Sequence, residues 1–494
     1  MHRYTTGMVR TTAWRRSRWS VCSFQGLAAG FVILVIAGCG PKTFDDPVTV
    51  LRSPDRSPYD HEDAMIQLDV TPDNEAYHEV LRRMIWKSGF AIDTKRAAFD
   101  RLEQNDLEGL KRTIRLQLPR MTTITWLEIL CQLIEEHGWR DLSPALVSSW
   151  SREAQVWGPD EETRPEYLAL VGLHGEDQVI DVVFEMFKSS DTARERGLRE
   201  RSWTLLHRLG ERERLVELVA QPLPEDSNDG MLLDLQSGAQ DLGILPRNRE
   251  EILWMRKLRD PSRSLFWKEA SGAVKLMPQS ERVNLELRTL PVVVAAARHR
   301  PELLVEDTTS LYSDLSNQLD QRKHYGYSRT FKGFRGDSPQ RLNEFSEKLN
   351  WGDLAAMHIA IEAMSVPELV GHMFDYADRD KQDATTEYGG VINLDVQGRF
   401  QILEFTPRNR RHDEMFVASQ EMFDAGYTSP YHFHLHVQQH DNKEFAGPGH
   451  GDLNYADNTR TNCLVFTFVD EDTLNVDFYR HSGVVVDLGV IKRP

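Results

Sequence analysis

The pattern of apolar residues predicts helices between about residues 73 and 320. Apolar residues recur there at spacings of three and four, which is the period of an amphipathic helix. The clearest stretches are NEAYHEVLRRMIWKSGF, TTITWLEILCQLIEEHG and GEDQVIDVVFEMFKS. Another stretch, RERSWTLLHRLGERERLVELVAQPLPED, predicts two helices joined at a glycine turn and ended by proline. Such pairs are typical of HEAT-like or TPR-like repeat arrays, and an irregular helical domain fits the pattern equally well.

The pattern becomes strand-rich in the C-terminal part of the chain. Residues 351–376 keep a helical period, but the apolar segments that follow are short, β-branched or aromatic, and bounded by turn residues. Six segments predict strands: YGGVINLD, GRFQILEF, PYHFHLHV, NCLVFTFV, LNVDFYR and GVVVDLG. Helical pieces interrupt them near residues 415–425 and after Asp452. The predicted fold class is therefore α+β, with an all-helical region over residues 73–320 and a compact mixed domain over residues 351–494.

Two segments lack a clear period. Residues 39–72 are rich in Pro, Asp, Ser and Arg, which predicts a flexible tether. Residues 321–350 predict a linker, or a loop that packs on the following domain. The stretch DQRKHYGYSRTFKGFRGDSPQR mixes aromatic and basic residues with glycine, so a nucleic-acid-binding strip is the alternative there.

The charge of the chain argues against nucleic acid as a partner. Its 494 residues carry a formal net charge of −17, whereas phosphate contacts need clustered Lys and Arg. Hydrophobic residues make up 40% and charged residues 27%, which is ordinary for globular protein. Length and composition predict roughly two to four domains, with enough apolar material to bury a core.

The N-terminus has the features of an export signal. Several arginines precede the apolar run LAAGFVILVIA, which is shorter than the roughly 20 residues that span a bilayer. The sequence Ile36-Ala37-Gly38-Cys39 comes next and resembles the lipobox of bacterial lipoproteins. This resemblance implies a signal peptide over residues 1–38, lipid on Cys39, and a membrane-anchored position in the cell envelope, facing the periplasm or the surface. An ordinary signal peptide and a membrane-anchor helix are the alternatives.

Beyond the signal the chain has few familiar catalytic motifs. It contains no glycine-rich phosphate loop, no G-x-S-x-G elbow and no HExxH helix. Cys131 and Cys463 lie in different predicted domains. We expect them to be buried thiols, although export would permit a disulfide.

A histidine-rich strand is the strongest candidate for chemistry. In PYHFHLHV two sets of side chains face opposite ways: Phe433, Leu435 and Val437 on one side, and His432, His434 and His436 on the other. Neighbours on one side lie roughly 6.5–7 Å apart at Cα, so two imidazoles can reach one ion. Zinc prefers imidazole nitrogen and carboxylate oxygen. Asp452, delivered by the turn AGPGHGD, is the candidate for the carboxylate.

The order of these features resembles the JAMM (MPN-type, JAB-like) metalloprotease domain. That family carries an upstream Glu, then H-x-H near the end of a strand, then S-x-x-D at the start of a helix. Here TEYGGVI supplies Glu387 after a predicted helix, HFHLH supplies H-x-H, and PGHGD matches the last element except for its Ser. The resemblance covers roughly residues 351–490, which is under a third of the chain.

The resemblance implies a zinc-dependent peptidase. One zinc ion would lie on His434, His436 and Asp452, and Glu387 would be the general base for hydrolysis of a peptide or isopeptide amide. His432 is an alternate ligand, because His432 and His434 form the fallback H-x-H pair. Glu368 in VPELVGHMF is the second candidate for the acid.

The sequence departs from the family at two points. Gly449 stands where the family has the Ser that helps to stabilise the oxyanion, and fifteen residues separate His436 from Asp452, more than the family usually has. A backbone N–H at Gly449, or His450, is then the candidate oxyanion donor. His440 is a candidate to support the metal ligands, with a solvated loop histidine as its alternative.

Other interpretations of the histidine strand stay open. HFHLHVQ fits the pattern of a histidine-triad nucleotide hydrolase, but over fifty residues follow it. Gly426 and His432-Phe433-His434 fit the opening of a cupin motif, but Gln438 or Gln439 stands where its Glu is expected. A polar strand face without chemistry is the simplest alternative. The chain would then be a lipid-anchored helical binding scaffold whose JAB-like domain is inactive.

Overall fold

The computed structural model describes residues 41–152, 160–189, 196–224, 227–325, 327–331, 334–338, 340–405 and 416–494. The predicted signal peptide over residues 1–38 and the predicted lipidation site Cys39 lie outside these residues.

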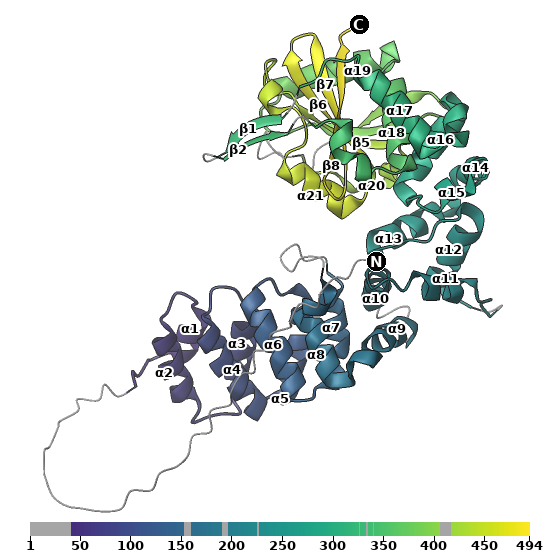
Figure 1. Cartoon of the computed structure of the whole chain (residues 1–494). Coiled ribbons are helices and arrows are strands. Elements are labelled where there is room, and N and C mark those ends of the chain that lie inside the picture. The colour runs from purple at the N-terminus through teal and green to yellow at the C-terminus, as the bar shows by residue number, and fades with distance from the viewer. Residues whose placement is uncertain are drawn as a thin grey trace, which may run out of the picture.

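A series of helices forms the N-terminal part of the molecule (Figure 1). One hydrophobic core, with buried residues from Val50 to Ile252, holds these helices together. The helices are α1 Pro47–Arg52, α2 Pro58–Leu68, α3 Glu75–Trp86, α4 Ile92–Asn105, α5 Leu107–Gln117, α6 Ile124–Glu136, α7 Ser143–Trp150, α8 Pro165–His174, α9 Val179–Ser189, α10 Arg196–Arg208, α11 Arg212–Ala220 and α12 Gly230–Ser237. The predicted helical region is therefore present.

The predicted tether over residues 39–72 is wrong for residues 47–68, which form α1 and α2. Each helix has a capping side chain followed directly by proline, Asp46 before α1 and Ser57 before α2. This combination is a helix-start signal. The helices are short, so their apolar residues show no visible period, but Leu51 and Met65 are fully buried in the N-terminal core.

The C-terminal part is built on a six-stranded mixed sheet. The strand order is β4-β3-β5-β6-β7-β8, and only β5 and β6 pair in parallel. The strands are β3 Gly389–Leu394, β4 Phe400–Glu404, β5 Tyr431–His436, β6 Cys463–Asp470, β7 Thr473–Arg480 and β8 Val484–Lys492. The six predicted strands are thus confirmed, and so is the mixed class of helices followed by a sheet.

Helices cover both faces of this sheet. The helices of the C-terminal part are α13 Arg249–Leu258, α14 Ser264–Val274, α15 Gln279–Arg282, α16 Leu290–His299, α17 Thr308–Leu319, α18 Trp351–Ala363, α19 Pro367–Gln382, α20 Gln420–Gly426 and α21 His450–Thr459. On one face α19 packs Tyr376 edge-on against Phe433 of β5. On the other face Ala456 of α21 and Met422 of α20 belong to two small apolar clusters with the strands. The central strand β5 is consequently buried along its whole length.

The boundary between the two cores differs from the predicted domain boundaries. The core of the sheet includes buried residues from Leu242 to Ile491, so α14, α16 and α17 belong to it, while α13 contributes to both cores, with Trp254 in this one and Ile252 in the N-terminal one. A helical period shows that a helix has an apolar face, but not which core that face joins. The predicted linker over residues 321–350 also has structure: the hairpin strands β1 Tyr327–Phe331 and β2 Phe334–Ser338, and the 3₁₀ helix η9 Leu342–Lys348.

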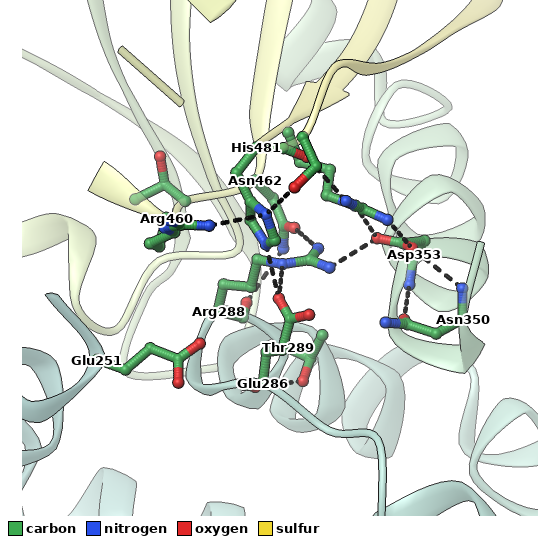
Figure 2. Close-up of polar contacts among 12 residues, drawn as sticks. Glu251, Glu286, Arg288, Thr289, Asn350, Asp353, Arg460, Asn462 and His481 are labelled. Atoms are coloured by element: carbon green, nitrogen blue, oxygen red, sulfur yellow. Dashed lines mark hydrogen bonds and ion pairs between the residues drawn. The ribbon is translucent and has the colours of Figure 1, made fainter. Parts of the chain in front are cut away.

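A buried charged network fixes the helices preceding the sheet to the sheet itself (Figure 2). Arg288 has almost no exposed surface. Its guanidinium donates to Glu286 Oε2 at 2.5 Å, to Asp353 Oδ1 of α18 at 2.8 Å and to Asn462 Oδ1 beside β6 at 2.5 Å. Arg480 of β7 donates to both oxygens of Asp353. Buried charges need such complete pairing. These contacts therefore hold the segment around Arg288 and helix α18 in one arrangement against the sheet.

Glu251 lies at the edge of this network, and we expect it to make stability depend on pH (Figure 2). Burial, and then the negative charge of Glu286, raises the pKa of Glu251 to about 7. The folded state therefore binds a proton that the unfolded chain has already lost. The resulting stability is complete below the unfolded pKa of about 4.3 and is lost as pH rises through 7.

The variant Glu251→Gln should lose this pH dependence. Relative to the wild type, its melting temperature should rise from pH 5 to about pH 7 and then level off, and the corresponding gain in unfolding free energy is up to ~3 kcal/mol. Thermal unfolding across that range measures the difference. The exposed Glu217→Gln on α11 is the control, and an equal pH response in both variants would contradict the assignment.

Two smaller expectations can be compared with the fold. Cys131 and Cys463 are both free and buried, as predicted. Within the described ranges no single helix is long and apolar enough to cross a membrane, and α18 with α19 meets that test only as a pair bent by 87°.

Candidate metal centre

The sheet places the three histidines on one buried face. Phe433 and Leu435 belong to the core of the sheet, whereas His432, His434 and His436 face α20 and α21, as the alternation predicts. The histidines are only 3%, 5% and 7% exposed. Three buried imidazoles on one strand face need polar partners, because a polar group buried without one is costly.

His434, His436 and Asp452 converge on one point. His434 Nε2 lies 3.1 Å from His436 Nε2 and 3.3 Å from Asp452 Oδ1, and His436 Nε2 lies 3.6 Å from Asp452 Oδ2. The three ligand-type atoms all fall within 4.8 Å of one another. Asp452 is the most accessible of the three, with 22% of its side chain exposed. The predicted donor set is thus brought together, and a small cation fits it.

Asp452 is held in place by its own helix. It stands in the first turn of α21, where its Oδ2 accepts the Gly449 N–H at 2.6 Å. Burial would raise the pKa of this carboxyl, but the charges and hydrogen bonds of His434 and His436 hold the pKa well below its ordinary value. Asp452 is therefore a charged acceptor, which is the form that a metal ion requires.

Groups behind the two imidazoles fix their orientation. His436 Nδ1 lies 3.0 Å from the Phe445 carbonyl oxygen, which only accepts, so this nitrogen carries a proton and Nε2 is the ring nitrogen turned toward Asp452. His434 Nδ1 lies 3.3 Å from the Tyr479 hydroxyl. Metal-binding histidines commonly have such partners on the other ring nitrogen. The sequence did not reveal either partner, since Tyr479 is 45 residues from His434 and Phe445 contributes only its backbone carbonyl.

The register of the sheet brings Glu387 to the same face. Gly389 of β3 pairs with His434, and the Leu435 N–H donates to the Tyr388 carbonyl at 3.1 Å. Continued two residues beyond β3, this register would set Glu387 opposite His436, on the histidine face. The side chain is 5% exposed, and Glu387 Oε1 accepts from Gln438 Nε2 at 3.3 Å. The other candidate acid, Glu368, is exposed in the first turn of α19, across the sheet.

His432 does not join the cluster. Its Nδ1 contacts the Tyr455 hydroxyl at 2.7 Å, and the ring tilts against Phe423 and Tyr455. The metal-type group found among the described residues contains His434, His436 and Asp452 without it. The geometry therefore favours the His434/His436 pair over the fallback pair.

The remaining candidates have different positions. The Gly449 N–H already bonds Asp452, which argues against its predicted role as an oxyanion donor. His450 is exposed at the first residue of α21 and stays a candidate for that role. His440 packs edge-on against Phe468, a residue of the core on the opposite sheet face, so a direct part in the cluster is not supported.

No family model matches the chain, and no curated protein or solved structure matches it either.

Proposed function

We propose that the chain is a zinc-dependent metallopeptidase with a JAMM-like (JAB-like) C-terminal domain, hydrolysing a peptide or isopeptide amide. The observation that carries the proposal is the meeting of His434, His436 and Asp452, beside which the register of β3 and β5 would set Glu387. These residues come from separate segments of the chain. They are also the residues that the resemblance selected before the fold was known.

The donor set fits zinc better than other common ions. Two imidazole nitrogens and one carboxylate oxygen suit a tetrahedral ion and leave a fourth position for water, whereas Mg²⁺ and Ca²⁺ prefer oxygen donors. Bound there, zinc would lower the pKa of that water toward neutrality. With zinc bound, Glu387 would be the group that accepts the water proton on a carboxylate oxygen and delivers it to the leaving amine nitrogen. Tyr479 and the Phe445 carbonyl hold the two imidazoles, so the ligand geometry is fixed beforehand.

The setting of the enzyme follows from the rest of the sequence. We infer a bacterial cell-envelope lipoprotein, anchored through lipid on Cys39, whose substrate is an envelope peptide or protein. The N-terminal helices, which we interpret as HEAT-like or TPR-like pairs, would position this substrate. An acidic body with a net charge of −17 gains little membrane attraction from its own charges, so a covalent lipid would supply the anchor.

Metal analysis with an activity assay tests the proposal. The purified protein should hold about one zinc per chain, and hydrolysis of a peptide library should stop after chelation and resume when zinc is added back. Protein that holds no zinc and takes none up would contradict the proposal. The chain would then be better interpreted as a lipid-anchored helical scaffold with an inactive JAB-like domain.

A further inference from the structure

Two adjoining cavities lie where the N-terminal helices meet the C-terminal part. Their volumes are about 300 and 330 Å³, and both are lined by Arg249, Glu250 and Asn458. The first cavity is walled by α10, α13 and the end of α21, and the second by α13, α20, α21 and β5. Because the cavities share residues, one molecule could extend through both.

The first cavity is strongly basic in an acidic protein. Four arginines line it, Arg152, Arg201, Arg249 and Arg460, against the two acids Glu250 and Asp457. One of these acids, Asp457, also accepts the Ser482 N–H at 2.8 Å through its Oδ1. The lining therefore carries an excess of positive charge, in a chain whose net charge is −17.

The arginines of this cavity are only partly neutralised. Arg249 pairs with Glu200 at 3.1 Å and with Glu250 at 3.9 Å, but Arg152 donates to the backbone carbonyls of Pro119 and Met121, which carry no charge. Arg201 has no ion pair with any residue in the described ranges. Burial, and then the positive charges of Arg249 and Arg152, lowers the pKa of Arg201. Clustered guanidinium groups of this kind are suited to bind an oxyanion bidentately.

The second cavity is mainly aromatic and apolar. Trp254, Phe423 and Tyr427 line it, and Trp254 meets Tyr427 edge-on at 5.7 Å between ring centroids. Such walls favour a flat apolar group, because ring stacking and burial both contribute.

One polar atom in the wall of the second cavity lacks a partner. His432 lines this cavity and is only 3% exposed, yet its Nε2 has no hydrogen-bond partner among the residues that the structure describes. A Cβ atom at Gly426 would lie 2.0 Å from this nitrogen, so only glycine fits against the His432 ring at this position. The ring of His432 therefore forms a closed part of the cavity wall, and its unpartnered nitrogen is covered by Gly426.

We propose that the two cavities form one binding site for a small organic anion, a phosphate or carboxylate carried on a flat apolar group. The oxyanion would lie on Arg201, Arg152 and Arg249, and the apolar group between Trp254, Phe423 and Tyr427. The site is separate from the candidate metal centre and does not depend on zinc. It does contact the same elements, because His432 lies on β5 and Asn458 on α21, which also carry His434 and Asp452.

Titration with phenyl phosphate tests the site, with inorganic phosphate, benzoate and phenol as comparison ligands. Calorimetry on metal-free protein at constant ionic strength should give saturable binding of phenyl phosphate. Inorganic phosphate should bind at least about 10-fold more weakly than phenyl phosphate, because it leaves the aromatic cavity unfilled. Phenol should also bind more weakly, because it lacks the oxyanion, and benzoate shows whether a carboxylate serves as well as a phosphate. The proposal would be overturned if neither phenyl phosphate nor benzoate showed saturable binding. It would also be overturned if inorganic phosphate bound as tightly as phenyl phosphate.

Variants locate the binding. Arg201→Gln should weaken phenyl phosphate binding by about 10- to 100-fold, the effect expected for losing hydrogen bonds to a charged group. The exposed Arg83→Ala on α3 should leave binding unchanged. Phe423→Leu should reduce the preference for phenyl phosphate over inorganic phosphate. Equal losses of binding in the Arg201 and Arg83 variants would show non-specific attraction and refute the site. Where a variant folds poorly, the titration of the wild-type protein with the four ligands still tests the proposal.

Discussion

Replacing Glu387 by glutamine should lower kcat for amide hydrolysis by about 10²- to 10⁴-fold, the usual contribution of a general base. Glutamine has nearly the same shape and can still accept from Gln438, but it cannot take a proton from water. Glu387 is not among the three residues of the metal-type cluster, so zinc content should stay the same. Steady-state kinetics with metal analysis of the same samples measure both effects.

Glu368→Gln is the matched control for this experiment. Glu368 is the other acid that the sequence offers, but it is exposed in the first turn of α19, across the sheet from the histidines. Its replacement should change kcat by less than about twofold, because it touches neither the cluster nor Glu387. Full activity in the Glu387 variant, or a large loss in the Glu368 variant, would remove Glu387 from the mechanism.

The site was predictable because its residues follow local rules. Strict alternation in PYHFHLHV gave the face of each histidine, and the Gly/Pro-rich turn before Asp452 indicated a new helix start. The sequence could not choose between His432/His434 and His434/His436, since all three histidines share one face. The structure favours the second pair, because the Tyr455 hydroxyl contacts the His432 ring and His432 lies outside the metal-type cluster. That contact depends on how α21 packs, which no local pattern encodes.

The larger organisation was less predictable than the elements. The strands were placed correctly, but the sheet shares its core with helices from α13 onward. Arg288 illustrates the reason: its partners Asp353 and Asn462 are 65 and 174 residues away in sequence. Contacts at such separations depend on the assembled fold rather than on a window of residues. The helices α1 and α2 were missed for the opposite reason, because they are too short to show a period.

The double variant His434→Ala/His436→Ala should lose zinc completely. Two of the three protein ligands disappear, and one carboxylate that already accepts the Gly449 N–H is too weak a site alone. In wild-type protein, zinc at about 100 times its Kd should stabilise the fold by ~2.7 kcal/mol, which raises the melting temperature by about 5–10 °C. The double variant should show neither bound zinc nor this rise. Metal analysis and thermal unfolding with and without zinc measure both.

His440→Ala separates loss of the site from general loss of a histidine near β5. His440 follows the same strand but packs on Phe468 at the opposite sheet face, so this variant should retain about one zinc and the full thermal shift. Zinc retained by the double variant would place the ion elsewhere and contradict the proposed centre. Zinc lost from all variants alike would instead indicate that folding of the loop between β5 and α21 limits binding. With zinc lost only from the double variant, the ligands are assigned to His434 and His436, since His432 is unchanged in every protein compared.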